Sequence, residues 1–222
     1  MSDPQPMNGV LLDLAERLGG MIVSDEQIER YEAERERDRR RERLTASGID
    51  EHLPPDIVDA VVADELDRTH AVDLVRRWVA YQAGPRAQGS KTVFGLLGNM
   101  GRGKTVAAAW LIAAEGGRYM LAEDFCRLQS ARFGDERAEY LRLLRLRTLV
   151  VDEVGTEESA ERGQAMLHDI ADRRLARRTL LLGNVTKAEL RERLDARTTD
   201  RLRSCGVFHE LAGESMRSGG GL

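Results

Sequence analysis

Cysteine is scarce in this sequence, which has only Cys126 and Cys205 among its 222 residues. The two lie far apart, and neither has cysteine or histidine neighbours at the spacing of metal ligands, which argues against a disulfide framework and against a zinc site. Long apolar runs are also missing, since every run is far shorter than the about 18 residues of a transmembrane helix. The N-terminus lacks the basic and then apolar pattern of a secretion signal. We therefore expect a cytoplasmic protein that does not contact a membrane.

Aromatic residues are sparse at 5%, and neither sign of charge dominates the chain. There are 34 lysines and arginines against 38 acidic residues, so the formal net charge is −4. A chain with this balance has no global basic field that would attract nucleic acid, although a local basic surface remains open. The apolar fraction of 41% is enough for a hydrophobic core, and the length fits one large domain with an appendage.

The N-terminal residues differ in composition from the rest. The apolar stripe Leu11–Leu18 predicts one amphipathic helix, and Ser24 with Gln27 forms a capping box that opens a second helix. This second helix is polar on all sides and therefore has no broad apolar face to bury. Two interpretations stay open: a solvated, partly disordered arm, or an arm that docks on a partner protein through the apolar stripe or through Ile28 and Tyr31.

From Pro54 onward the sequence is typical of a globular α/β domain. Helices are expected over residues 56–66 and 69–82, followed by a loop with the sequence AGPRAQGS. Short apolar runs then alternate with helical stretches; the runs are TVFGLL, RYMLA, TLVVD and TLLLGN. Near-continuous apolar strands separated by helices predict a parallel sheet that is covered by helices on both faces.

The segment FGLLGNMGRGKT combines the end of a predicted strand with a glycine-rich loop. It contains the pattern G-x-x-x-x-G-K-[ST], whose backbone amides and following helix N-terminus bind phosphate. Lysine is rare in this chain, which has three, and the compact ammonium of Lys104 fits between phosphate oxygens inside a tight loop. The predicted nucleotide-binding residues are Gly98, Asn99, Met100, Gly101, Arg102, Gly103, Lys104, Thr105 and Val106.

The segment LVVDEVG places Asp152 and Glu153 at the C-terminal end of a predicted strand, which is the end that faces the ligand crevice of a parallel sheet. Thr105 and Asp152 are predicted to hold Mg²⁺, and Glu153 is predicted to polarise the attacking water. Asn184 ends the run TLLLGN and is expected to orient that water. The competing interpretations are that the two carboxylates cap a strand at the surface and that the asparagine only begins a turn.

The order of these motifs resembles that of AAA+ ATPases, and more narrowly that of the DnaC/DnaI-type replicative helicase loaders and their relative IstB. The resemblance covers approximately residues 44–217, and the segments that carry it are RERLTASGIDEHL, RYMLAEDFCRLQSARF, MLHDIADRRLARRTLLLGNVTKAEL and DARTTDRLRSCGVFHELAGESMR. It implies a five-stranded parallel sheet between helices, with no C-terminal lid domain. The expected organisation is a helical N-terminal arm over 1–50, an AAA+ ATPase domain over 51–217 and a disordered tail over 218–222.

The resemblance also implies roles for single residues near the C-terminus. Asn184 becomes the residue that senses the γ-phosphate, and Arg201 becomes an arginine finger that acts on the neighbouring subunit, with Arg197 as the competing candidate. Arg217, in GESMR, becomes a second phosphate-sensing residue. Alternatively, Arg197, Arg201 and Arg203 are ordinary solvated charges on a helix. The adenine pocket is expected near Leu53–Pro55.

In the loader family, single-stranded DNA is expected along the helices between the second and third strands. There Arg127, Arg132 and Arg137 could contact phosphates. Phe125 and Phe133 lie in the same stretch, and we expect them in the core rather than as stacking platforms for bases.

The function implied by the resemblance is that of an ATP- and Mg²⁺-dependent loader. It would bind a hexameric replicative helicase of the DnaB type, deliver it onto single-stranded DNA, and self-associate in a ring or spiral. The arm has no cysteines for a zinc module and matches no sequence pattern of the family. Two alternatives stay open: an IstB-like helper of a transposase, which binds double-stranded DNA, and a static assembly switch that binds ATP with negligible turnover.

Overall fold

The computed structural model describes residues 24–66, 69–84 and 91–212. These residues form a five-stranded sheet in the order β2-β3-β4-β1-β5, and every neighbouring pair is parallel. The strands are β1 (Val93–Leu97), β2 (Arg118–Leu121), β3 (Thr148–Val154), β4 (Arg178–Gly183) and β5 (Gly206–Glu210). The predicted α/β class with a five-stranded parallel sheet is confirmed.

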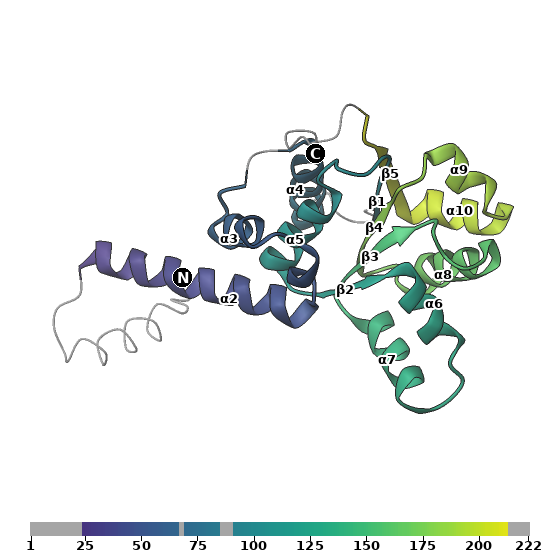
Figure 1. Cartoon of the computed structure of the whole chain (residues 1–222), viewed down its shortest axis with the longest axis horizontal. Helices are drawn as coiled ribbons and strands as arrows, with labels where there is room; N and C mark the ends of the chain where they lie inside the picture. Colours follow the sequence, from purple (N-terminus) through teal and green to yellow (C-terminus); the bar gives the residue numbers. More distant parts are fainter. Residues whose placement is uncertain (1–23, 67–68, 85–90, 213–222) are drawn as a thin grey trace, which may run out of the picture.

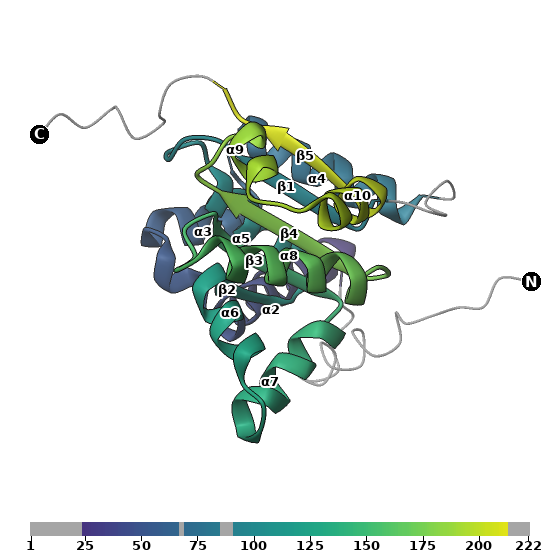
Figure 2. The ribbon, with the colours of Figure 1, turned by 90° about the vertical axis from the view of Figure 1, so that its right-hand side faces the viewer.

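Helices cover both faces of this sheet (Figures 1 and 2). One face carries α2 (Asp25–Ser47), η1 (Asp50–His52), α3 (Pro55–Ala63), α4 (His70–Ala83) and α5 (Lys104–Glu115). The other face carries α6 (Ala122–Ser130), α7 (Gly134–Arg145), α8 (Ala160–Arg173), α9 (Lys187–Glu192) and α10 (Ala196–Cys205). The long helix α2 confirms the expected helical arm and extends away from the sheet in Figure 1.

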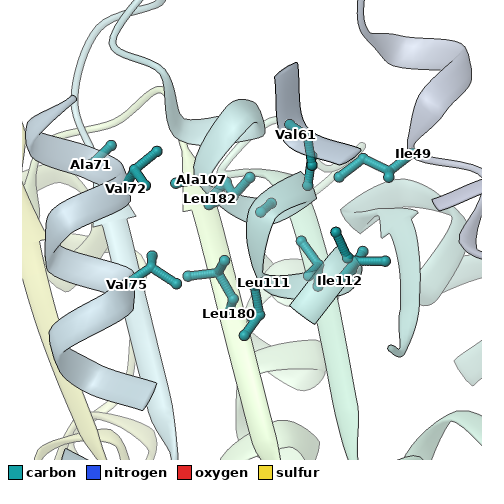
Figure 3. Close-up of a cluster of buried hydrophobic side chains, with 14 of the residues drawn as sticks. Ile49, Val61, Ala71, Val72, Val75, Ala107, Leu111, Ile112, Leu180 and Leu182 are labelled. Carbon is teal, nitrogen blue, oxygen red and sulfur yellow. The ribbon is translucent and has the colours of Figure 1, made fainter. Parts of the chain in front are cut away.

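The sheet separates two hydrophobic cores because successive side chains of a strand point to opposite faces. In β4, Leu180 and Leu182 pack in the core under α3, α4 and α5, whereas Leu181 packs in the core under α6, α8 and α10. Figure 3 shows the first of these cores, where Leu180 and Leu182 meet the alanine-rich face of α5. Both faces of the central strands are therefore buried, which explains their nearly continuous apolar sequence.

Three expectations from the sequence differ from the structure. The helix expected over residues 56–66 ends at Ala63, because Asp64 adopts a left-handed conformation with φ of 58°. The strand β5 was not among the predicted apolar runs, because it is a half-buried edge strand that pairs only with β1 among the described residues. Phe125 is buried as expected, but Phe133 is 87% exposed in the turn before α7, so its expected place in the core was wrong.

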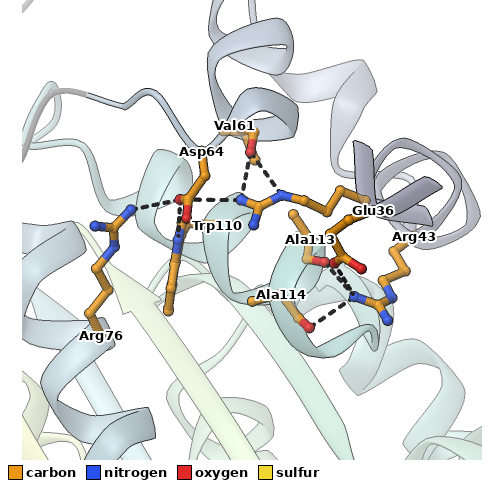
Figure 4. A network of polar contacts seen from close by, with 9 residues as sticks. Glu36, Arg43, Val61, Asp64, Arg76, Trp110, Ala113 and Ala114 are labelled. Carbon is orange, nitrogen blue, oxygen red and sulfur yellow. Dashed lines mark hydrogen bonds and ion pairs between the residues drawn. The ribbon is translucent and has the colours of Figure 1, made fainter. Parts of the chain in front are cut away.

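The C-terminal half of α2 packs against the helices of the first face through its polar side chains (Figure 4). Arg40 donates from Nε and one terminal nitrogen to the carbonyl of Val61, at 3.2 and 2.7 Å, and Arg43 donates to the carbonyls of Ala113 and Ala114 at 2.8 and 2.9 Å. These carbonyls belong to the last turns of α3 and α5, where a cation adds donors to the helix end and compensates the helix dipole. Leu44 is fully buried beside them.

The arm therefore has two parts. Its last turns pack on the first face of the sheet, while most side chains of its first turns are exposed, as in the ion pair of Arg30 with Glu26. Tyr31, one of the two residues predicted as docking anchors, is buried. The apolar stripe Leu11–Leu18 lies outside the described residues, as does the tail over 218–222, and the domain boundary at residue 50 stays a prediction. No helix in the described part of the chain is both long enough and apolar enough to cross a membrane.

Candidate functional site

A cleft of about 410 Å³ lies at the C-terminal edge of the sheet. The parallel strands β1, β3 and β4 all end there, so the polar residues that follow each strand meet around one space. The cleft is lined by Met100, Gly101, Arg102, Gly103, Lys104, Thr105 and Val106 of the glycine-rich loop and α5, by Asp152, Glu153 and Asn184, and by His52, Leu53, Pro54 and Ile57. The structure thus brings together most of the predicted site residues.

The glycine-rich loop depends on backbone conformations that other residues rarely adopt. Gly98 has φ of 113°, and a side chain there would come within 2.7 Å of the Leu211 carbonyl oxygen. Gly103, with φ of 71°, is the residue immediately before α5. Since the first amides of a helix have no partner within the helix, the start of α5 presents donors and a positive dipole end at the cleft. This arrangement suits an anion.

Lys104 is held inside the loop and is only 7% exposed. Its Nζ donates to the carbonyl oxygens of Gly98 and Asn99, at 2.6 and 2.8 Å. Burial lowers the pKa of the Lys104 ammonium, and the carboxylate of Asp152 opposes that shift. Gly98 and Asn99 do not line the cleft, but their carbonyls position the cation that does.

Asp152 is the centre of the polar contacts between the strands and α5. Its Oδ2 accepts from the hydroxyl of Thr105 at 3.3 Å and from the hydroxyl of Tyr119 at 3.0 Å. Its Oδ1 accepts from the backbone amide of Glu153 at 2.7 Å. The carboxylate is buried, and these three donors hold both of its oxygens in place.

Tyr119 is a residue that the sequence analysis missed. It lies in β2 opposite Val150 of β3, so its long side chain reaches diagonally to Asp152 on the same face. Burial and the neighbouring Asp152 raise the pKa of the Tyr119 hydroxyl well above its usual range, which keeps it a donor. The ring of His52 lies 4.9 Å from that of Tyr119 and connects it to the wall of the cleft. The contact of Tyr119 with Asp152 depends on the register of β2 against β3, and the sequence alone does not show that register.

Glu153 has an unusual backbone conformation for a residue with a side chain. Its φ is 60°, and the register between β3 and β4 shifts between Val151 and Val154. Such conformations are costly and gather at functional sites. The irregularity interrupts the alternation of β3 next to Asp152, and the Glu153 side chain is exposed at the cleft.

The oxygens of Thr105 and Asp152 fit the requirements of Mg²⁺. This ion takes hard oxygen ligands, and proteins usually supply one or two of them while water and substrate phosphates complete the octahedron. The two side chains are 3.3 Å apart at the mouth of the glycine-rich loop. No group of three acidic, histidine or cysteine side chains suited to a metal occurs among the described residues, so an all-protein cage is not what this part of the chain offers.

The remaining predicted residues lie in different places. Asn184 follows β4 and is exposed at the cleft. Arg201 of α10 does not line the cleft and instead pairs with Asp172 of α8 at 3.0 Å. Arg197 is exposed in the first turn of α10, and Arg217 lies outside the described residues. The roles of the three arginines therefore stay predictions.

One part of the cleft wall is apolar. Leu53, Pro54 and Ile57 come from the connection between η1 and α3, close to the segment where the adenine pocket was expected. Apolar surfaces of this kind accommodate a flat base, whereas the loop across the cleft carries the amides and the ammonium. One side of the cleft suits a base, and the other suits phosphates and a cation.

Comparison with known proteins gives likenesses in structure and none in sequence. No protein-family model matches the chain, and no curated protein matches it significantly. The crystal structure of DnaI superposes with a TM-score of 0.55 at 21% identity, covering 72% of this chain and 95% of that one. The crystal structure of the DnaC helicase loader superposes with a TM-score of 0.51 at 19% identity, covering 66% and 92%. At these identities the likeness shows the fold alone, an α/β domain built on a five-stranded parallel sheet.

Proposed function

We propose that this chain is an AAA+ ATPase that binds a hexameric replicative helicase of the DnaB type and delivers it onto single-stranded DNA. The observation that carries the ATPase part is the contact of Thr105 with Asp152 beside the buried ammonium of Lys104, in a cleft with an apolar wall. The fold shared with DnaI and with the DnaC helicase loader supports the loading part. The chain would self-associate in a ring or spiral, as the resemblance implies.

The residues of the cleft would divide the work of binding and hydrolysing ATP. The amides at the start of α5 and the ammonium of Lys104 bind the phosphates, and the apolar wall holds the adenine. Bound Mg²⁺, held by Thr105 and Asp152, would neutralise charge on the phosphate oxygens. Glu153 accepts the proton of the attacking water, and Asn184 orients that water with its amide.

Arg201 would act on the cleft of a neighbouring subunit, with Arg197 as the alternative. A guanidinium presents fixed donors to the γ-phosphate, which is why such fingers accelerate phosphoryl transfer. Because Arg201 is held by Asp172 in this structure, docking of a neighbour would exchange a carboxylate for a phosphate. Hydrolysis triggered in this way would release the loader from the helicase.

The test of the loader function is capture of a hexameric replicative helicase by the full chain in ATP and in ADP. A second protein lacking residues 1–34 tests the arm. This cut leaves Arg40, Arg43 and Leu44 in place, because removing them would strip contacts from α3 and α5. The full chain should capture the helicase in ATP, and the shortened protein should lose capture while it keeps its ATP affinity. Equal capture by both proteins would show that residues 1–34 are not the docking element.

The two alternative functions need separate measurements. Release of phosphate, stimulated by helicase and DNA, distinguishes a motor from a static switch. A preference of the ATP-bound oligomer for single-stranded DNA would favour a helicase loader, and wrapping of duplex DNA by that oligomer would favour a transposase helper. Negligible turnover under all conditions would leave only the switch.

A further inference from the structure

The edge of the sheet opposite the nucleotide cleft is rich in arginine. It is formed by two connections, residues 141–147 at the end of α7 and residues 173–178 between α8 and β4. Their sequences, LRLLRLR and RRLARR, contain seven arginines and no acidic residue. We call the surface formed by these two segments the arginine edge. Because β3 and β4 begin here and end at the cleft, the two sites lie on opposite edges, about 20 Å apart along the strands.

Backbone and side-chain contacts hold the two segments side by side. The amide of Arg178 donates to the carbonyl of Arg147 at 2.9 Å, and Nε of Arg177 donates to the carbonyl of Arg145 at 3.1 Å. The buried guanidinium of Arg174 donates to the carbonyls of Leu143 and Leu146. The arginine edge is therefore a fixed surface and not a pair of independent loops.

Nearby carboxylates neutralise only part of this charge. Glu115 pairs with both Arg147 and Arg178, at 3.2 and 2.6 Å. Glu139 pairs with Arg142 and Asp169 with Arg173. Arg145 and Arg177 have no carboxylate partner among the residues that the structure describes. In a chain whose net charge is −4, this edge is locally positive.

The chemistry of the arginine edge fits a phosphate backbone. Guanidinium groups present donors in a planar fork that matches phosphate oxygens, and such contacts need no base readout. The exposed large apolar side chain within the edge is Leu175, at 50%, and neither segment contains an aromatic residue on which a base could stack. Binding that relies on charge without stacking favours the polymer with the higher charge density, which is duplex DNA.

We propose that the arginine edge binds the phosphate backbone of duplex DNA. This surface goes beyond the loader function, in which the substrate strand is single. It would hold the duplex that flanks an opened region while the opposite edge of the sheet binds and hydrolyses ATP. The binding is independent of sequence and falls with rising salt, because each neutralised phosphate releases a counterion.

The test compares two full-length triple variants that change the net charge equally. The first replaces Arg145, Arg147 and Arg177 by glutamine; all three are exposed or half-buried and lie outside the cleft, so ATP affinity should stay unchanged. Loss of the Arg177 hydrogen bond and of the exposed ion pair of Arg147 should lower the unfolding temperature by at most a few degrees. The matched control replaces three exposed arginines of α2, namely Arg30, Arg39 and Arg41, by glutamine. The readout is the affinity for a short random-sequence duplex over a range of salt concentrations.

The first variant should bind the duplex at least tenfold more weakly, and the slope of log affinity against log salt should fall by about 2.7, or about 0.9 for each lost phosphate contact. The control should keep the slope of the unchanged protein. The single change Arg145→Gln, at a side chain that holds no other group in the described structure, should lower the slope by about 0.9.

Three outcomes would overturn the proposal. Equal losses in both triple variants would assign the effect to overall charge. An equal loss for a single strand of the same length would remove the preference for duplex. A loss of binding to polyglutamate with unchanged DNA binding would assign the arginine edge to an acidic protein partner.

Discussion

Arg174 provides the sharpest test of how this fold is held together. Its side chain is completely buried and faces neutral acceptors only: the hydroxyl of Thr179 at 2.9 Å, the carbonyls of Leu146 and Arg178 at 3.1 and 3.0 Å, and the carbonyl of Leu143. Burial, with a smaller effect of the neighbouring Arg177, lowers the pKa of Arg174 to about 10. The guanidinium thus ties the end of α7 to the start of β4.

The change Arg174→Lys keeps the charge but removes the planar fork. An ammonium is a point donor and cannot reach four acceptors spread around a guanidinium, so at least two hydrogen bonds to a charged donor are lost. At about 1.5–3 kcal/mol each, the free energy of unfolding should fall by about 3–6 kcal/mol. For a chain of this size, at about 2–4 °C per kcal/mol, the melting temperature should fall by roughly 6–24 °C.

Thermal and urea unfolding measure this effect, with Arg177→Lys as the control. Arg177 is half-buried and donates to a single carbonyl, so its replacement should cost no more than about 0.5 kcal/mol. Arg174→Met should cost less than Arg174→Lys, because it removes the burial of an unmatched charge together with the hydrogen bonds. A loss below about 1 kcal/mol for Arg174→Lys would refute the role of the fork geometry.

Four further changes test the nucleotide cleft. Lys104→Ala should weaken ATP binding by about 10- to 100-fold, since it removes charged hydrogen bonds to phosphate; unchanged affinity in calorimetry would contradict the proposed site. Glu153→Gln should keep ATP binding and slow phosphate release by about 10²- to 10⁴-fold, and near-normal turnover would exclude it as the base. Tyr119→Phe should raise the Mg²⁺ concentration needed for half-maximal hydrolysis by about 10-fold or more, because the Asp152 carboxylate loses one of the two hydrogen bonds that orient its Oδ2; ATP binding without Mg²⁺ serves as its control. Arg201→Ala should be inactive alone but regain turnover when mixed with Lys104→Ala, which supplies an intact finger; failure of the mixture would favour Arg197 or reject action between subunits.

The sequence by itself determined the class of fold and predicted which residues meet in the cleft. The glycine-rich pattern around Lys104 is local, because consecutive residues form the loop and its positive φ angles need glycine. The apolar runs of the central strands are local as well, and parallel pairing then sends Asp152 and Asn184 to the same edge as the loop. These inferences needed only spacing and strand direction.

The tertiary structure decided what depends on register and on contacts between distant segments. The contact of Tyr119 with Asp152 exists only because β2 pairs with β3 in one particular register, and the strained Glu153 follows from an irregularity that its own sequence does not signal. The polar helix α2 was expected to have no broad apolar face to bury, yet its arginines donate to the carbonyl ends of other helices. In the same way, two arginine-rich connections that each look like solvated charge form one surface, because hydrogen bonds between separate chain segments cannot be read from either segment alone.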